Sequence, residues 1–321
     1  MIVEVQHETC LTYSDSVTES LAEVRMEPVS DEHQSCRSFS LMIKPGAEVF
    51  RYQDGFGNRV HHFNVLSACR TLGVVAASVV ETHPANGRLA SSRATWPLNL
   101  EALEMPCYGF LGFRGPVRAT PLLEPLLERL CPNEGCLVGE FVLRVADYIA
   151  HHFEYARDVT LASSPIDDLL SQGKGVCQDF THLMIAVLRS FQIPARYVSG
   201  YIHRPNKDSQ SHAWVEAWLP DVGWCGIDPT NRTEVNEHFI KVAVGRDFSD
   251  VAPNKGVYRG RAEEGILVRV ETRALERLPS LQWQEKLPPF EVPLTPVMAR
   301  SRHALTTAYD DGSQQQQQQQ Q

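Results

Sequence analysis

The segment Gly173-Lys-Gly-Val-Cys-Gln-Asp-Phe-Thr-His182 runs from a glycine-rich turn straight into an amphipathic helix. Its cysteine, Cys177, falls where the helix begins, so the thiol meets unpaired backbone N–H groups and the positive end of the helix dipole. Both favour the thiolate, which is the nucleophilic form of cysteine. Gly173 and Gly175 let the backbone turn sharply and leave the sulfur open to a substrate. Cys177 is therefore a candidate nucleophile.

An inert, packed thiol is the alternative for Cys177. Apolar residues recur after it at helical spacing, which predicts a helix with one buried face, and Cys177 lies one turn before the first of them. These positions are Phe180, Leu183, Met184, Val187, Leu188 and Phe191. A cysteine that only extends this stripe would be a small core residue. The choice depends on whether partner residues exist elsewhere in the chain.

The nearest histidine, His182, is poorly placed to be the base. It lies five residues further along the helix, which rotates it about 140° from Cys177 and moves it about 7.5 Å along the axis. We expect it to be a packing or surface residue. A better candidate is His212, in the alternating stretch Ser211-His-Ala-Trp-Val-Glu-Ala-Trp-Leu219, which predicts a strand. The alternative for His212 is a half-exposed strand histidine without a catalytic role.

The next stretch supplies an acid. Asp221 to Gly223 predicts a hairpin turn, and Gly223 to Asp228 predicts the returning strand, antiparallel to the strand of His212. Asp228 could then accept a hydrogen bond from the imidazole, fix its tautomer and stabilise the imidazolium. The alternative is structural, since Asp-Pro often opens a turn. Cysteine, histidine and aspartate in this order predict a cysteine-nucleophile triad.

At this point several blocks of sequence resemble the bacterial transglutaminase-like proteins, a branch of the papain-like cysteine superfamily. The blocks are Gly175-Val-Cys-Gln-Asp-Phe180, Ile193-Pro-Ala-Arg-Tyr-Val-Ser-Gly-Tyr201, Ser211-His-Ala-Trp-Val-Glu216, Gly223-Trp-Cys-Gly-Ile-Asp-Pro-Thr230 and Val244-Gly-Arg-Asp-Phe-Ser-Asp-Val251. Weaker similarity at His7-Glu-Thr-Cys-Leu-Thr-Tyr13 matches the β-rich N-terminal region of these proteins. The resemblance implies that Cys177 is the nucleophile, His212 the base and Asp228 the orienting acid.

The resemblance also implies a fold and a chemistry. The fold is α+β, with a papain-like core in which the cysteine helix packs on an antiparallel sheet. The chemistry is acyl transfer from an amide through a thioester, by a peptidase or amidase that uses water. Transglutaminase-type transfer to an amine and a non-catalytic peptide-binding module are the alternatives. Gln178 stands where animal transglutaminases place Trp, and no carboxylate-rich loop of the EF-hand kind is seen, so calcium-dependent crosslinking is not expected.

The composition of the chain indicates which binding partners and which cellular compartment to expect. The chain has 321 residues, 43% of them hydrophobic, and a formal net charge of −9, which supports a substantial core and disfavours a nucleic-acid partner. The first residues lack the basic and apolar regions of a signal peptide, and no apolar run is long enough to span a bilayer. We expect a cytoplasmic enzyme without a membrane partner, acting on a peptide or protein amide.

Cysteine and histidine spacing predicts no metal site and no cofactor. Among the eight cysteines only Cys131 and Cys136 lie close together, and no second pair or spaced histidines follow. The adjacent pairs His61-His62 and His151-His152 point apart on a strand or a helix, so they make poor joint ligands. Scattered, reduced thiols also suit a reducing compartment.

The chain divides into three predicted segments. Residues 1–110 alternate like strands and predict a β-sandwich-like domain, and residues 111–275 carry the candidate triad and predict the catalytic domain. Residues 276–321 are rich in proline and end in a glutamine run, which predicts disorder in part. Within the second segment helices are expected at 122–130 and 139–155 and a strand at 195–202. Arg246, Asp247 and Asp250 near a turn are expected to form a structural ion pair or to support the site.

Overall fold

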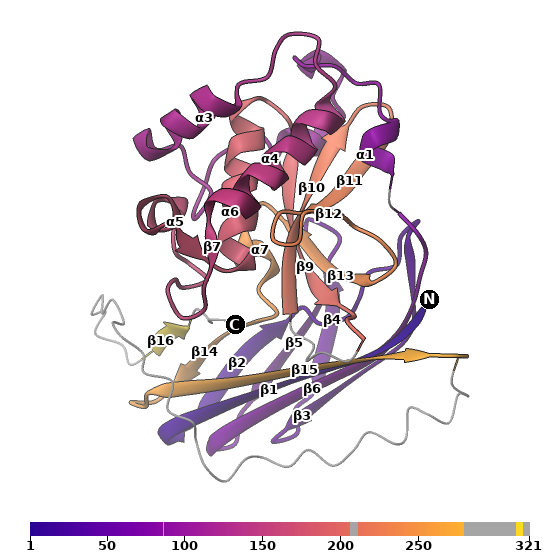
Figure 1. Ribbon diagram of the computed structural model, residues 1–321. Helices are drawn as coiled ribbons and strands as arrows, with labels where there is room; N and C mark the ends of the chain where they lie inside the picture. Colours follow the sequence, from indigo (N-terminus) through magenta and orange to yellow (C-terminus); the bar gives the residue numbers. More distant parts are fainter. Residues whose placement is uncertain (86, 206–210, 279–312, 317–321) are drawn as a thin grey trace. The chain divides into compact units, whose positions relative to one another are not determined.

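The computed structural model describes residues 1–85, 87–205, 211–278 and 313–316, and the chain forms two compact units (Figure 1). One unit contains the described residues of Met1–Glu81, His203–Gln210 and Pro253–Gln320, and the other contains those of Thr82–Ile202 and Ser211–Ala252. These boundaries differ from the predicted divisions at 110 and 275. The first unit also includes a later stretch of the chain, because the strands after residue 253 pair with strands near the N-terminus.

The first unit is built from two antiparallel sheets. One has the strand order β15(Glu264–Leu275), β1(Ile2–Val17), β6(Cys69–Thr82), β3(Gln34–Lys44). The other has the order β16(Ser313–Gln316), β14(Asn254–Arg259), β2(Glu19–Val24), β5(Arg59–Val65), β4(Val49–Gln53). Leu11 and Leu72 of the first sheet share one buried cluster with Phe63 and Tyr258 of the second. A shared core between two sheets is a β-sandwich, as the sequence predicted.

Two strands late in the sequence, β14 and β15, belong to this unit and pair with its N-terminal strands. β15 pairs with β1 from Ile2↔Leu275 to Tyr13↔Glu264, and β14 pairs with β2 from Asn254↔Val24 to Arg259↔Glu19. A period-two pattern shows that a segment is a strand but does not show which strand it joins. The predicted tail disorder falls mostly on residues outside those that the structure describes; Ser313–Gln316 form β16, which pairs with β14.

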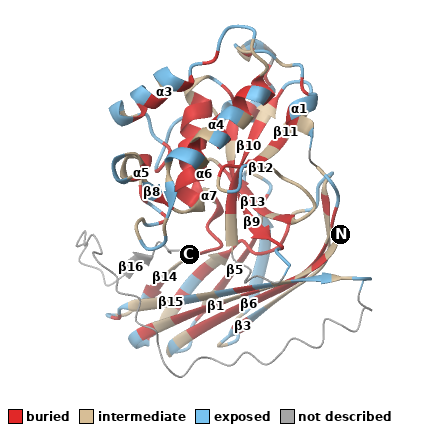
Figure 2. Cartoon of the chain, in the orientation of Figure 1, coloured by how far each residue is buried: buried red, intermediate tan, exposed pale blue. Residues whose placement is uncertain are grey.

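The second unit has one antiparallel sheet of order β12(Thr233–Glu234), β11(Gly223–Asp228), β10(Ser211–Leu219), β9(Ala195–Ile202), β13(Phe239–Gly245). The helix α6(Cys177–Ser190) contacts β9 and β10, and α4(Val138–His152) packs on α6. Both α6 and the strands beneath it are buried along most of their length (Figure 2). The predicted cysteine helix on an antiparallel sheet is therefore present, and the strands predicted at 195–202 and 223–228 are confirmed.

Shorter elements complete the second unit. They are α1(Arg88–Ser91), η1(Leu100–Ala102), α2(Met105–Tyr108), η2(Pro121–Leu123), α3(Glu124–Leu130), β7(Glu154–Tyr155), α5(Ile166–Gln172), β8(Lys174–Gly175) and α7(Phe248–Val251). The helix expected at 139–155 ends at His152, because the next residues form β7, which pairs in parallel with β8. This pairing places residues 154–156 beside the turn that leads into α6.

Candidate active site

The turn before α6 has the backbone that its glycines allow. Gly173 ends α5 in the left-handed region with φ of 70°, where a side chain is disfavoured. Gly175 has no room for a side chain, since a Cβ there would lie 2.8 Å from Oδ2 of Asp179. Val176 is extended and caps the helix, and Cys177 is its first residue, half-buried. The sulfur is therefore held at a helix start and remains in part accessible to solvent.

His212 and Asp228 meet across neighbouring strands. Nε2 of His212 on β10 lies 2.8 Å from Oδ2 of Asp228, the last residue of β11. The histidine side chain is 9% exposed and the aspartate fully buried. The ladder between β10 and β11, which includes Val215↔Ile227, sets this approach. The structure therefore brings the predicted base and the predicted acid together.

Asp228 makes both kinds of contact that its sequence context suggested, one to a turn and one to the imidazole. Its Oδ1 accepts the backbone N–H groups of Thr230 at 2.8 Å and Asn231 at 3.3 Å, which is the turn expected of Asp-Pro. Its Oδ2 accepts from His212 and from the side-chain amide of Asn231, at 2.6 Å. Asn231 was not predicted, and its only signal in the sequence is its position three residues after Asp228. It anchors the carboxylate that faces the imidazole.

The electrostatics of the pair favour an imidazolium. Burial by itself would lower the pKa of His212, but the charge and hydrogen bond of Asp228, together with the nearby Cys177, raise it to about 10. Burial would likewise raise the pKa of Asp228, but His212, Asn231 and Thr230 lower it. Since Nε2 of His212 faces Asp228, Nδ1 is the nitrogen left for the thiol. All three predicted residues thus meet at one place.

Aromatic side chains enclose the imidazole. The ring of Trp214, which is fully buried, stacks at 6.3 Å from His212, and Phe239 lies at the same centroid distance, tilted. Gly200 pairs with His212 in the ladder, and a Cβ there would lie 2.6 Å from Trp214 and 2.1 Å from the carbonyl oxygen of Ile240. Apolar side chains around the pair reduce the screening of its charges by water and so strengthen the His212–Asp228 interaction.

Glu216 forms a buried ion cluster further along the same strand. Its carboxylate lies 2.6 Å from Arg196 on β9 and 2.6 Å from Lys241 on β13, and burial alone would raise its pKa, but the two cations lower it to about 2. The guanidinium of Arg196 also lies 4.2 Å from the ring centroid of Trp224. Glu216 is therefore an ion-paired carboxylate inside the sheet. The ion pairs of Glu216 with Arg196 and Lys241 link three strands of the sheet that carries His212.

His182 was expected to be a packing or surface residue, and the structure shows that it packs. It is buried, its Nε2 accepts the backbone N–H of Phe248 at 3.2 Å, and its ring lies 5.0 Å from that of Tyr197. Burial, helped by the nearby charge of Arg189, lowers its pKa to about 3. A neutral imidazole that accepts a backbone hydrogen bond is tied to α7 and serves structure.

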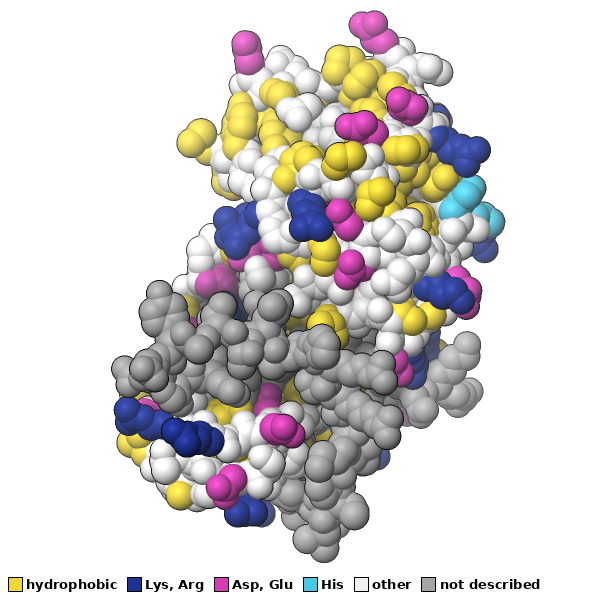
Figure 3. Space-filling model, turned by 90° about the vertical axis from the view of Figure 1, so that its left-hand side faces the viewer, with side chains coloured by type: hydrophobic (Ala, Val, Ile, Leu, Met, Phe, Trp, Pro, Cys, Tyr) yellow, Lys and Arg dark blue, Asp and Glu magenta, His cyan; other side chains and the backbone are white. Residues whose placement is uncertain are grey.

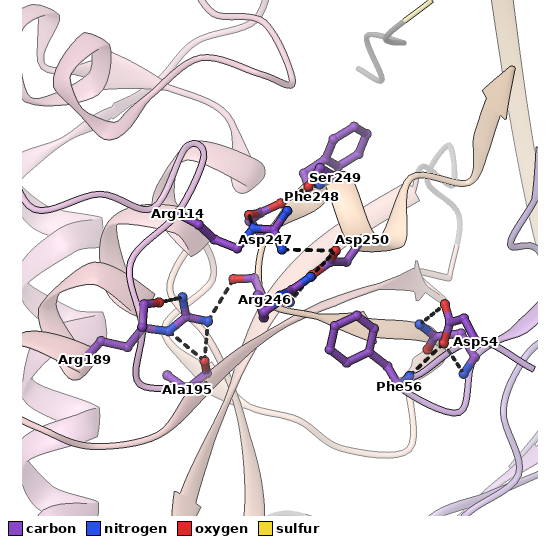
Figure 4. Close-up of polar contacts among 12 residues, drawn as sticks. Asp54, Phe56, Arg114, Arg189, Ala195, Arg246, Asp247, Phe248, Ser249 and Asp250 are labelled. Carbon is purple, nitrogen blue, oxygen red and sulfur yellow. Dashed lines mark hydrogen bonds and ion pairs between the residues drawn. The ribbon is translucent and has the colours of Figure 1, made fainter. Parts of the chain in front are cut away.

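The ion pairs near α7 are structural too (Figure 4). Arg246 binds Asp250 through Nε at 2.8 Å and Nη2 at 3.1 Å, and Asp247 caps α7 by accepting from the backbone of Ser249. The buried guanidinium of Arg189, at the end of α6, donates to three backbone carbonyls, those of Gly112, Ala195 and Arg246. This network fixes the C-terminal end of α6 to β9 and β13.

The part of the chain that the structure describes offers neither a metal centre nor a membrane-spanning helix. There, no group of three or more His, Cys, Asp or Glu residues is arranged to hold a metal ion, and all eight cysteines are free thiols. Among the described helices, none combines the length and the apolar character needed to cross a membrane. On the face that carries α3 and α5, apolar, acidic and basic side chains are interspersed (Figure 3).

Two protein-family models match this chain. The model of the transglutaminase-like superfamily matches residues 131–229, and that of the bacterial transglutaminase-like N-terminal region matches residues 3–81. An uncharacterized protein of Mycobacterium leprae is 35% identical over 85% of this chain and 99% of its own. A protein-glutamine gamma-glutamyltransferase of Pseudomonas aeruginosa is 37% identical over 79 residues, 20% of this chain and 11% of its own.

The fold also matches a solved structure. A candidate cysteine protease from Cytophaga hutchinsonii superimposes with a TM-score of 0.70 and 23% identity, over 87% of this chain and 93% of that one. Together with the two family models, this match confirms the predicted α+β fold with a β-rich N-terminal region.

Proposed function

We propose that this chain, which belongs to the transglutaminase-like superfamily, is a cysteine-dependent acyl-transfer enzyme that cleaves amide bonds of peptides or proteins. One observation carries the proposal: Nε2 of His212 lies 2.8 Å from the buried carboxylate of Asp228, and the half-buried Cys177 thiol, at a helix start, is near enough to the same imidazole to help raise its pKa. A purely structural cysteine needs neither partner. Nucleophile, base and orienting acid in contact are the arrangement that covalent catalysis requires.

Acylation would use each of the three residues once. The Cys177 thiolate attacks the amide carbonyl carbon, and the carbonyl oxygen becomes an oxyanion that the backbone N–H of Cys177 can bind. The imidazolium of His212 then gives its proton to the leaving nitrogen as the C–N bond breaks, which releases an amine or ammonia and leaves a thioester. Asp228 holds the ring and stabilises its charge during the transfer.

Deacylation would reverse the proton movement. The neutral imidazole of His212 takes a proton from water, the resulting hydroxide attacks the thioester carbon, and the C–S bond breaks to give a carboxylic acid. The sulfur leaves as a thiolate beside the re-formed imidazolium, so the resting state is restored. Hydrolysis is the preferred outcome because the partial exposure of Cys177 leaves the thioester open to solvent water.

A peptide substrate suits the surroundings of the thiol. Tyr155 on β7 pairs with Gly175, two residues before Cys177, and the residue is 45% exposed. Leu161, in the segment between β7 and α5, is also exposed. Exposed apolar side chains beside a nucleophile can bind the apolar parts of a polypeptide. They support a peptide or protein amide as the substrate class.

Transfer to an amine is the second candidate. It is favoured by the 79-residue similarity to a protein-glutamine gamma-glutamyltransferase. The test is mass spectrometry of a protected glutaminyl peptide incubated with the protein, with and without a primary amine. Release of ammonia with a gain of glutamate supports hydrolysis, and an amine adduct supports transfer. Cys177→Ala must abolish both products, and normal turnover by this variant would refute the mechanism.

A non-catalytic peptide-binding module is the third candidate, and thiol reactivity separates it from an enzyme. An activated thiolate reacts with iodoacetamide at neutral pH much faster than an ordinary cysteine does. Fast labelling of Cys177 that slows in His212→Ala supports the enzyme. Slow labelling that is equal in the two proteins supports the binding module. Labelling with an electrophilic acyl probe, followed by competition with candidate peptides, then narrows the substrate.

A further inference from the structure

A second carboxylate lies close to the nucleophile. Asp179 is the third residue of α6, two positions after Cys177, and it is 4% exposed. Its Oδ2 accepts two hydrogen bonds, from the backbone N–H of Val176 at 2.8 Å and from the hydroxyl of Thr160 at 2.6 Å. Neither donor is a cation, so this carboxylate acts as an acceptor and not as half of an ion pair.

The first of these bonds fixes the peptide groups around Cys177. Val176 donates to Asp179, and its carbonyl accepts the N–H of Phe180 at 3.2 Å as α6 begins. With the N–H and the carbonyl of Val176 both held, the following N–H, that of Cys177, has a set direction. This N–H belongs to the first turn of the helix, where no intrahelical acceptor exists, so it is available to an oxyanion.

The second bond ties another segment to the same turn. Thr160 lies in the connection between β7 and α5. A second hydrogen bond holds this connection, from the backbone N–H of Ala156 to the carbonyl of Gly175 at 2.9 Å. Within that connection the backbone N–H of Leu161 donates to the hydroxyl of Ser164 at 3.1 Å. Asp179 therefore joins the connecting segment, the turn and the helix through a single oxygen atom.

The packing around Asp179 leaves it little freedom. Oδ2 and Cβ of Asp179 lie 2.8 and 2.9 Å from the position of a Cβ on Gly175, so the side chain rests directly on the backbone of that glycine. Burial, and after it the nearness of Cys177 and Asp179, raises the pKa of the hydroxyl of Tyr197. The carboxylate is thus packed beside the nucleophile without bonding to it.

We propose that Asp179 is a positioning residue for the acyl transfer: through Val176 and Thr160 it holds the Cys177 N–H and the neighbouring 156–164 segment in the geometry that the oxyanion requires. The inference rests on the proposed function, and it adds a residue outside the Cys177–His212–Asp228 triad. Asp179 exchanges no proton with the substrate, because its contribution is the acceptor position of Oδ2. Its negative charge is therefore dispensable, whereas its oxygen is not.

Paired substitutions separate positioning from simple stability. Asp179→Ala removes the acceptor, and Asp179→Asn keeps an oxygen that can accept both bonds while removing the charge. Thr160→Val removes the hydroxyl, and Thr160→Ser keeps it. The matched control is Thr181→Val on the same helix, because the hydroxyl of Thr181 is fully buried and has no hydrogen-bond partner within the described part of the chain. Circular dichroism and thermal melting establish that each variant is folded.

The measurements are kcat and KM for ammonia release from a protected glutaminyl-glycine peptide, and the rate of alkylation of Cys177 by iodoacetamide. We expect Asp179→Ala to lower kcat about 100-fold with little change in KM, since displacement of a catalytic group by about 1 Å has an effect of this size. Thr160→Val should lower kcat by a smaller factor. Asp179→Asn and Thr160→Ser should restore most of kcat, and Thr181→Val should equal the wild type.

Two results would overturn the positioning role. One is wild-type kcat in a folded Asp179→Ala variant, and the other is a kcat for Asp179→Asn as low as that for Asp179→Ala, which would mean that the charge matters. If the wild type releases no ammonia, the proposed function fails on this substrate, and the alkylation rate then decides the inference by itself. Slower alkylation in Asp179→Ala than in Thr181→Val supports it, and equal rates in all variants refute it.

Discussion

Nε2 of His212 lies 2.8 Å from Oδ2 of Asp228, a fully buried carboxylate at the end of the neighbouring strand. This contact commits one ring nitrogen to the acid and turns the other toward Cys177. It also explains why the pKa of a histidine that burial alone would make less basic is raised to about 10. The proton on His212 is thereby retained at neutral pH, ready for the leaving nitrogen.

The first prediction concerns Asp228→Asn, which keeps the shape of the side chain and removes its charge. In the wild type the imidazolium is present below a pH of about 10 and is lost as pH rises through that value, so kcat/KM should fall there. Without the carboxylate charge the pKa of His212 falls, and this alkaline limb should move to lower pH. The turnover itself should fall about 10²–10⁴-fold, the usual contribution of acid–base catalysis. A pH profile of kcat/KM for the two proteins makes the comparison.

The matched control for this substitution is Asn231→Ala. It removes a donor to the same Oδ2 but leaves the carboxylate charge and its contact with His212. The alkaline limb of Asn231→Ala should therefore stay near that of the wild type. An unmoved limb in Asp228→Asn would contradict the role given to Asp228.

Much of this arrangement could be predicted from the sequence. The alternation through His212 and the turn before Gly223 predicted two adjacent antiparallel strands, and adjacent strands bring His212 and Asp228 together. The rotation of His182 away from Cys177 around α6 predicted that the two side chains would not face each other, and left packing and surface positions open. These features are local, and the periods of helix and strand are enough to derive them.

The contacts that the sequence did not reveal are those between distant segments. Thr160 meets Asp179 only because β7 pairs with β8, a two-residue contact too short to leave a pattern. The domain boundaries differ for the same reason, since the alternation of β15 predicts a strand but cannot show that its partner is β1. The spacing of residues along the chain indicates which side of a helix or strand is buried and where turns fall. Which distant strands pair depends on how the whole chain packs.

The second prediction concerns the buried ion cluster of Glu216. Glu216→Ala would leave Arg196 and Lys241 without their carboxylate in a buried place, and an unpaired buried charge costs about 3–5 kcal/mol of folding free energy. Urea unfolding of the wild type and the variant measures this loss. The control is Asp147→Ala, which breaks exposed pairs with His151 and Arg232 and should cost about 1 kcal/mol or less. Equal losses in the two variants would contradict the assignment.

The third prediction concerns acid stability and His182. Its folded-state pKa of about 3 lies below the ordinary value of 6.5, so as pH falls below 6.5 the unfolded chain takes up a proton that the folded protein does not. Stability is therefore lost on the acid side, by about 2 kcal/mol from this residue between pH 7 and pH 5. His182→Gln cannot titrate, so its unfolding free energy should fall less between these two pH values. An unchanged pH dependence in this variant would show that His182 is already free to ionise.

The fourth prediction concerns Gly200, the ladder partner of His212. A Cβ at this position would lie 2.1 Å from the carbonyl oxygen of Ile240 and 2.6 Å from Trp214, so Gly200→Ala must displace both the β9–β13 pairing and the indole that stacks on His212. Overpacking of this kind costs about 1–3 kcal/mol or more, and movement of Trp214 should also reduce kcat. Gly112→Ala is the control, since nothing lies within 4 Å of its Cβ position and its stability should be unchanged. Thermal melting and kcat for the two variants decide it: if Gly200→Ala melts and turns over like Gly112→Ala, the close contact between β9 and Trp214 does not hold His212 in place.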